Sequence, residues 1–462
     1  MQMAAMPPYA GLDEVYHVAR LAFVRAERRG PTMVESSVPP YLARSIAADP
    51  HAAPAFCVVG PRWSEVVRSR PVMIDQPVDG PPYVTPNYES QQPPLYYSIA
   101  ARLVPARSAM FELGMWRLMS VLFAIVVVVG TALIAQRWFG PAGILAGAIV
   151  LSLPTWHTLL VRASNDAFAC ALVTIAIVAT VYEKALPELI AWPLAIAAKL
   201  YTWPMVVVLP LLWRTQRARR FRVVGVALGC LIAAAITMLD LSARTRNPFG
   251  DFGFDPSRSG LVARSIRVLD MLKITVASAI WSSGQHWDAL TPLAMAIYML
   301  PLVAAVVWFR GRPIAWLALG AFAIAQIVNA AAFARTAQAG LPAGGKEGWY
   351  WYALAPIVVP ALLAPALKRV RALAWWLIGW DILITEVALF HDYSGASSPA
   401  HPTALFRWGP WHWPFTAHLD GIGVGPFVGA IVLLRIIYLA AFFALQSLTF
   451  HDRPHDLALP DS

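Results

Sequence analysis

An acidic pair, Asp13 and Glu14, stands in MPPYAGLDEVYHVARLAFVRAERRGP, about a hundred residues ahead of the first strongly apolar segment. A carboxylate at the aqueous face of a membrane protein can accept a proton from a reacting group or bind a metal ion. His17 follows Asp13 by four residues, so on a helix it shares a face with Asp13 and could share a proton or a divalent metal ion. Two ligands do not complete a metal site, so no metal-binding residues are assigned. The structural alternative is that both acids occupy the first turn of an exposed helix, which its dipole favours.

Further polar residues could bind a sugar or a phosphate group. Glu89 lies in YESQQPP, where Tyr88, Gln92 and Tyr96 add hydrogen-bonding groups. Aromatic side chains suit sugar rings, but they also anchor membrane proteins at the lipid interface without any ligand. The cations that could meet a phosphate group are Lys199, Arg264, Arg267 and Lys346. Each could instead extend its charge toward lipid headgroups while its stem stays in the membrane.

The composition indicates a membrane protein. Hydrophobic residues make up 58% of the 462 residues and charged residues only 13%, and apolar runs near twenty residues recur along the chain. A helix of about 20 apolar residues crosses a bilayer. The net charge of +10 does not indicate nucleic-acid binding, because the arginines fall in short clusters between apolar runs, where they act as topology signals. The cysteines, Cys57, Cys170 and Cys230, lack the spacing of a disulfide framework or a metal site.

We expect an all-α polytopic membrane protein with about eleven transmembrane helices, in a helical domain over residues 116–447. The expected spans are 116–136, 141–161, 166–183, 186–198, 200–213, 223–241, 289–309, 313–334, 349–367, 372–391 and 423–447. Pro193 and Pro204 interrupt the fourth and fifth spans, which should tilt or kink. Residues 1–115 have no comparable apolar run and are rich in proline, which indicates a large loop region.

The basic residues orient these spans. Lys and Arg gather in the short loops of one side of the membrane, and that side is therefore cytoplasmic. Residues 1–115 and the loops 242–288 and 392–422 then lie outside, and the tail 448–462 lies in the cytoplasm. Export of the first region needs a preceding helix, so we expect twelve spans if one helix is missing from this chain.

Three segments together resemble the GT-C superfamily of membrane glycosyltransferases, in particular its protein O-mannosyltransferase and aminoarabinose transferase branches. The first is PPYAGLDEVYHVARLAFVRAERRGP, and the second is YESQQPPLYYSIAARL. The third comprises RLMSVLFAIVVVVGTALIAQRWFG, SNDAFACAL and AIAAKLYTWPMVVVLPLL, which match the family's order of a span, an inner turn, an outer Asn-Asp at Asn165 and Asp166, and an outer lysine at Lys199. The late external segment departs from the family pattern and reads KEGWYWYALAPIVVP.

The resemblance implies a polytopic enzyme of the bacterial plasma (inner) membrane. It would transfer a sugar from a polyprenyl-phosphate donor to a glycan, lipid or protein acceptor on the extracytoplasmic face, with inversion at the anomeric carbon. By the same resemblance, Asp13 is the general base on the acceptor, Glu14 orients it or contacts the acceptor, and Lys199 meets the donor phosphate.

Two other functions remain open. A catalytically silent membrane subunit of a larger complex would share the same motifs. A transporter or flippase would share the span count, although no inverted repeat with matching broken helices is evident.

Overall fold

The computed structural model describes residues 14–31, 36–38, 42, 83–85, 92–150, 152, 159–160, 162–214, 220–244, 300, 303–304, 307–308, 312–336, 348–370, 372–380, 382 and 424–451. These residues are predominantly helical, as the sequence predicts. The described part also contains one short antiparallel ribbon, in which β1 (Ser36–Val38) pairs with β2 (Tyr83–Thr85) and places Ser37 opposite Val84. Strands of three residues are too short to give a readable alternation of apolar and polar positions, so the sequence did not indicate them.

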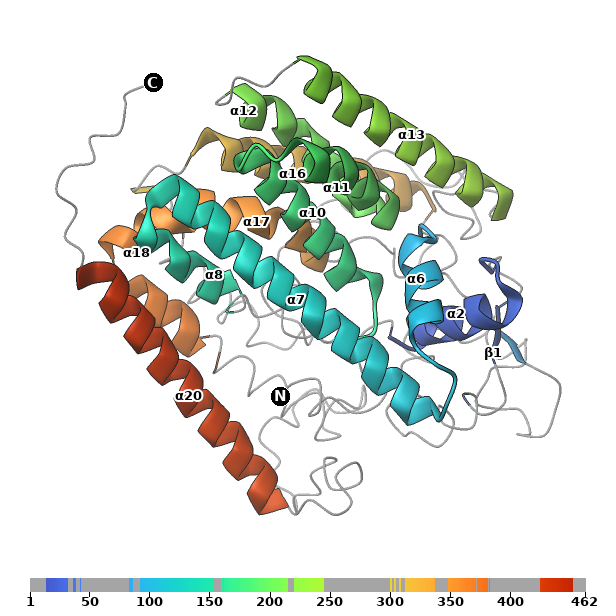
Figure 1. Cartoon of the computed structure of the whole chain (residues 1–462), viewed down its shortest axis with the longest axis horizontal. Helices are drawn as coiled ribbons and strands as arrows, with labels where there is room; N and C mark the ends of the chain where they lie inside the picture. Colours follow the sequence, from blue (N-terminus) through green and yellow to red (C-terminus); the bar gives the residue numbers. More distant parts are fainter. Residues whose placement is uncertain are drawn as a thin grey trace.

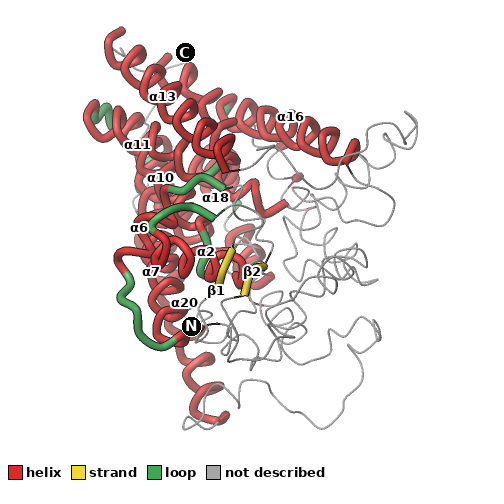
Figure 2. The backbone as a smooth tube through the Cα atoms, turned by 90° about the vertical axis from the view of Figure 1, so that its right-hand side faces the viewer, coloured by secondary structure: helices red, strands yellow, loops and turns green. Residues whose placement is uncertain are grey.

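Two helices accompany this ribbon in the region expected to be a loop. They are α2 (Glu14–Glu27) and α6 (Leu95–Leu103), and they pack against each other. Val18, Leu21 and Ala22 of α2 bury their side chains against Tyr97 and its neighbours on α6. The two helices therefore share a hydrophobic core, which also includes residues at the start of α7. Figure 2 shows β1 and β2 beside α2.

The helical domain starts with the long helix α7 (Ala109–Phe139), whose ends carry clear signals. Ser108 caps its first turn by accepting a hydrogen bond from the Phe111 amide at 3.3 Å. Gly140 ends it with a φ of +72°, a conformation that favours glycine. The elements that follow are η2 (Pro141–Gly143), α8 (Ile144–Val150), α10 (Asn165–Val181), α11 (Ala185–Ala198), η3 (Leu200–Val208), α12 (Leu209–Arg214), α13 (Arg220–Arg244), α16 (Pro313–Thr336), η5 (Gly348–Leu354), α17 (Ala355–Val358), η6 (Val359–Leu363), α18 (Ala364–Arg369), a helical stretch at 372–380, and α20 (Val424–His451).

Most expected spans coincide with these helices, but the count of eleven extends beyond the described residues. The expected span 289–309 lies largely outside them, as does the second half of 141–161. The span expected at 200–213 begins as a 3-10 helix, because Pro204 removes one backbone donor from the α-helical pattern. Within the described residues, two helical segments are long and apolar enough to cross a membrane, Ala109–Phe139 and Phe221–Ala243.

Helix α13 shows why a bilayer suits this surface. Only 17% of its most apolar window is buried inside the protein. Phe221, Leu231 and Leu239 are 91%, 68% and 70% exposed. Soluble monomers rarely carry a continuous apolar face of this extent, so we expect lipid to cover it.

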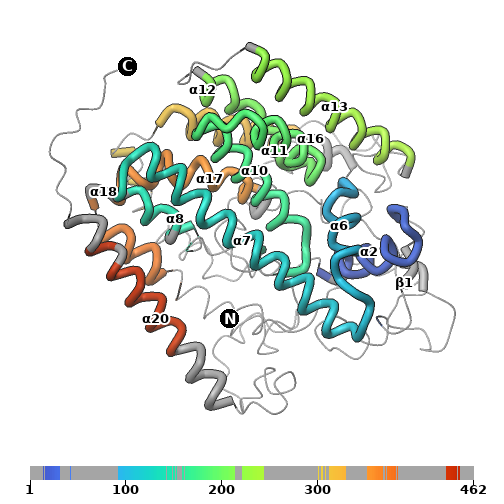
Figure 3. Tube along the Cα trace, in the orientation of Figure 1, coloured from blue at the N-terminus to red at the C-terminus, as the bar shows by residue number. Residues whose placement is uncertain are grey.

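The helical domain has two ends, which differ in the elements that lie there. Figure 1 shows α7 running across the molecule, with α2 and α6 beside its start and α8 and α18 beside its finish. Figure 3 shows α11 beside α10 and beside α13, and it packs against both. Close packing holds α7 to α10, because a Cβ on Gly130 would overlap the side chain of Thr174. We call the end with α2, the start of α10 and the finish of α11 the α2 end, and the opposite end the Glu188 end.

A buried polar cluster fixes the Glu188 end. The fully buried carboxylate of Glu188 pairs with Arg222 and accepts hydrogen bonds from Thr180 Oγ1 at 2.9 Å and Trp213 Nε1 at 2.8 Å. Trp192 Nε1 donates to the same threonine hydroxyl at 3.0 Å. One carboxylate thus joins α10, α11, α12 and α13. By the positive-inside prediction, this end faces the cytoplasm.

Replacing Arg222 with leucine should destabilise the protein by about 3 to 5 kcal/mol, because Glu188 would keep its charge in a buried place without its cation. The measurement is the thermal unfolding midpoint of the detergent-solubilised protein. Lys184→Leu at the same end is the matched control, because Lys184 is exposed. Equal midpoints for the two variants would show that the Glu188–Arg222 pair contributes nothing.

Candidate active site at the α2 end

The candidate site is built around the first turn of α10. Ser164 caps the helix: its Oγ accepts a hydrogen bond from the Asp166 amide at 3.4 Å. The same hydroxyl donates to Asp166 Oδ2 at 3.0 Å. Serine at the cap and aspartate in the first turn both satisfy the free amides and the dipole of a helix start. The motif Ser-Asn-Asp therefore begins the helix and presents Asn165 and Asp166 at its end.

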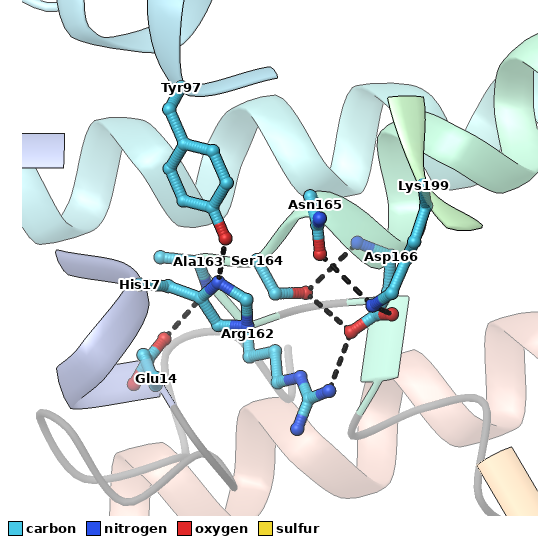
Figure 4. Close-up of polar contacts among 9 residues, drawn as sticks. All are labelled: Glu14, His17, Tyr97, Arg162, Ala163, Ser164, Asn165, Asp166 and Lys199. Carbon is cyan, nitrogen blue, oxygen red and sulfur yellow. Dashed lines mark hydrogen bonds and ion pairs between the residues drawn. The ribbon is translucent and has the colours of Figure 1, made fainter. Parts of the chain in front are cut away.

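Asp166 is fully buried and holds two cations (Figure 4). Arg162 Nη2 lies 2.6 Å from Asp166 Oδ2, and Lys199 Nζ pairs with Oδ1. Lys199 also donates to Asn165 Oδ1 at 3.0 Å. Because Lys199 directly follows α11, these contacts tie the finish of α11 to the start of α10. Both oxygens of Asp166 are occupied, so this carboxylate orients cations and is not available as a base.

Glu14, the first residue of α2, is also fully buried and engaged. Arg117 on α7 grips it through two hydrogen bonds, Nε to Oε1 at 2.9 Å and Nη2 to Oε2 at 2.6 Å. The Ala163 amide donates to Oε1 at 2.8 Å. Glu14 therefore joins the start of α2 to α7 and to the segment before α10, and both of its carboxylate oxygens accept hydrogen bonds.

His17 lies one turn further along α2 and is buried. Its Nδ1 shares a hydrogen bond of 2.6 Å with the Tyr97 hydroxyl. The guanidinium of Arg20 lies over the ring of the same tyrosine, 3.8 Å from its centre. Burial, assisted by the nearby charges of Arg162, Lys199 and Arg20, lowers the pKa of His17 well below its ordinary value. The imidazole is therefore neutral at pH 7.

Aromatic side chains close the site on two sides. Tyr96 packs with its ring centre 5.2 Å from that of Tyr97 and 5.7 Å from that of Phe168. Burial, with the negative charges of Glu14 and Asp166 nearby, raises the pKa of Tyr96, so its hydroxyl stays protonated. On the other side, Tyr352 of η5 is fully buried, and its ring centre lies 5.8 Å from Lys199 Nζ.

The structure brings seven of the predicted site residues into this region: Glu14, His17, Gln92, Tyr96, Asn165, Asp166 and Lys199. Gln92 takes part through its backbone carbonyl, which accepts from Arg20 Nη2 at 2.9 Å. The other predicted residues, Asp13, Tyr88, Glu89, Arg264, Arg267 and Lys346, lie outside the described residues.

Four further residues belong to the site and were not predicted. Arg162 stands four residues before Asp166, a spacing that could have indicated an ion pair. Arg117 lies within an expected span, where a charge needs a partner. Arg20 stands three residues after His17, on the same face of α2. Tyr352 gave no signal, because only the tertiary fold places η5 beside Lys199.

Among the described residues of this cluster, the Asn165 side-chain amide and the hydroxyls of Tyr96 and Tyr352 are buried polar groups with an atom that has no hydrogen-bond partner. Asn165 is fully buried, and its Oδ1 accepts from Lys199, but its Nδ2 makes no hydrogen bond there. A buried amide donor without an acceptor costs free energy, on the order of 1 to 3 kcal/mol. A ligand oxygen at this position would remove that cost. Within the described residues, no group of three His, Cys, Asp or Glu side chains could hold a metal ion.

The described residues form a helical protein with a buried polar site at one end. No protein-family model and no curated protein matches the sequence. Among solved structures, the chain is similar to ArnT from Cupriavidus metallidurans bound to undecaprenyl phosphate, with a TM-score of 0.42 and 18% identity over 94% of this chain and 74% of that chain. For the apo state of the same protein, the TM-score is 0.40 at 17% identity over 94% and 71%. At this level of likeness, function has to be inferred from the side chains of the site.

The depressed pKa of His17 predicts a stability that depends on pH. Below about pH 6.5, the ordinary pKa of histidine, the unfolded chain takes up a proton at this position and the folded protein does not. Stability therefore falls as the pH drops below that value. His17→Gln should flatten this dependence, measured as the unfolding midpoint in detergent at pH 7.5 and pH 5. Parallel curves for wild type and variant would contradict the neutral, buried state of His17.

Proposed function

We propose that the chain is an integral-membrane glycosyltransferase that transfers a sugar from a polyprenyl-phosphate donor to an acceptor on the extracytoplasmic face. The observation that carries the proposal is the open amide of Asn165 beside Lys199. Both donors are buried in one cluster at the end of apolar helices, where a lipid-borne phosphate would arrive. A phosphate offers the oxygen acceptors that both groups suit.

The geometry assigns different roles to the charged residues. Lys199 and Arg162 are held by Asp166, so their charges are fixed in place before a ligand binds. Fixed cations stabilise charge that develops on a departing phosphate without having to reorganise. Tyr96 and Tyr352 supply aromatic rings, and Tyr96 also supplies a protonated hydroxyl; both kinds of group suit a sugar. Arg264, Arg267 and Lys346 are further proposed contacts to the phosphate.

The reaction would be a single displacement with inversion. The acceptor hydroxyl or amine gives its proton to Asp13, its oxygen or nitrogen bonds to the anomeric carbon, and the bond from that carbon to the phosphate oxygen breaks. The polyprenyl phosphate leaves with the electron pair of that bond. Asp13 carries the base role because both Glu14 and Asp166 are fully engaged. Tyr88 and Glu89 would contact the sugar or the acceptor.

The same engagement of Glu14 and Asp166 favours one second candidate. If Asp13 does not reach an acceptor, neither buried carboxylate of the described site can replace it, and the chain would be a silent membrane subunit of a larger complex. In both cases we propose a multi-pass protein of the bacterial plasma membrane, with residues 1–115 outside and the carboxyl terminus in the cytoplasm.

Asp13→Asn should abolish transfer while leaving the protein at its normal level in the membrane. The measurement is the transfer of radiolabelled sugar from membrane lipid to any acceptor, in cells with the wild-type chain, with Asp13→Asn or with a deletion. Loss of the same labelled glycan in both mutants is expected. A defect in the deletion alone would leave the silent subunit as the function.

Asn165→Ala should lower the rate of the same transfer about tenfold or more, the effect of one hydrogen bond to a charged group. Thr131→Ala is the matched control. Thr131 is also fully buried, and its Oγ1 also has no partner among the described residues, but it lies in the middle of α7. Unchanged transfer by Asn165→Ala would remove the phosphate role of this amide.

A further inference from the structure

Arg117 is a charged residue within the apolar helix α7, and its side chain is only 6% exposed. A charge in such a place is costly unless it is paired and hydrogen-bonded. Arg117 pairs with Glu14 through two hydrogen bonds of 2.9 and 2.6 Å. The planar fork of a guanidinium holds a carboxylate in position as well as in orientation, which a lysine cannot do.

The same carboxylate links a third segment. Glu14 Oε1 also accepts from the backbone amide of Ala163, two residues before the start of α10. The start of α2, the body of α7 and the approach to Asp166 therefore meet at one side chain. Asp13 is joined to Glu14 by a peptide bond, which sets their Cα atoms about 3.8 Å apart.

We propose that Arg117 is a positioning residue for Asp13. It acts through Glu14, by fixing the first residue of α2 against α7 and against the segment that leads into α10. The proposal rests on the proposed function, since positioning matters because Asp13 is the base. Misplacing a reacting group by about 1 Å can cost about 100-fold in rate, so a clamp one residue away from the base is a sensitive point.

The chain offers a matched control on the same two helices. In the last turn of α2, Arg25 Nη2 lies 2.6 Å from Glu112 Oε2, in the first turn of α7. The side chain of Arg25 is 16% exposed and that of Glu112 is fully buried. This pair also joins α2 to α7, but it lies eleven residues from Glu14, or about 16 Å along a helix. Its loss should loosen α2 without displacing the residue next to Asp13.

The first experiment measures transfer of radiolabelled sugar in membranes, together with the unfolding midpoint. Arg117→Leu and Arg25→Leu should lower the midpoint by comparable amounts. Arg117→Leu should also reduce transfer about 100-fold, and Arg117→Lys, which keeps the charge but not the fork, should give an intermediate rate. Arg25→Leu should transfer close to the wild-type rate. Equal transfer by Arg117→Leu and Arg25→Leu at matched protein levels would overturn the proposal.

A second measurement does not depend on activity. Asp13→Cys in a Cys57→Ser background gives a thiol at position 13, and Cys170 and Cys230 stay buried. A water-soluble maleimide should label this thiol at a rate that changes several-fold when Arg117→Leu is added and stays the same when Arg25→Leu is added. If wild-type membranes show no sugar transfer but labelling behaves as expected, the proposed function fails and the positioning stands. Equal labelling rates with arginine and with leucine at position 117 would show that Arg117 does not set the place of residue 13.

Discussion

The structure depends on the burial of carboxylates that are fully paired. Asp166 lies at the start of α10 with Lys199, Arg162 and the Ser164 hydroxyl around it. Removing an ion from water costs several kcal/mol, and good pairing geometry is needed to recover that cost. The helices that carry the partners must therefore meet in one arrangement. Lys199 ties the finish of α11 to Asp166, and Arg162 ties the segment before α10 to the same carboxylate.

The same rule applies three more times in the described part of the chain. Glu14 holds Arg117, Glu112 holds Arg25, and Glu188 holds Arg222. Between these pairs, α7 and α10 are apolar and pack closely where Gly130 meets Thr174. Hydrophobic contact alone gives helices in lipid little preference for one neighbour, because lipid tails are as apolar as leucine. The polar pairs supply that preference, and one of them lies in the proposed binding site.

At the α2 end, the charged side chains are paired and one buried amide is left without a partner among the described residues. Its cations are immobilised by carboxylates, its histidine is kept neutral by burial, and Asn165 retains one open donor. In the proposed function, an anion would bind here without first breaking a charge pair. That arrangement suits a lipid-borne phosphate, which approaches in the plane of the membrane toward the end of the helices.

The sequence by itself indicated the helical class and the positions of most helices, and its resemblance to a family pointed to Asn165, Asp166 and Lys199 at the start of α10. The helical features follow from local properties, namely apolar runs of a given length and helix caps. The tertiary structure alone decided that Glu14 pairs with Arg117, 103 residues away, and that Tyr352 lies beside Lys199. No local rule contains such pairings, because they arise from which helices pack together. Whether a buried carboxylate is a base or a clamp depends on those partners, so the role of Glu14 could be read only from the fold.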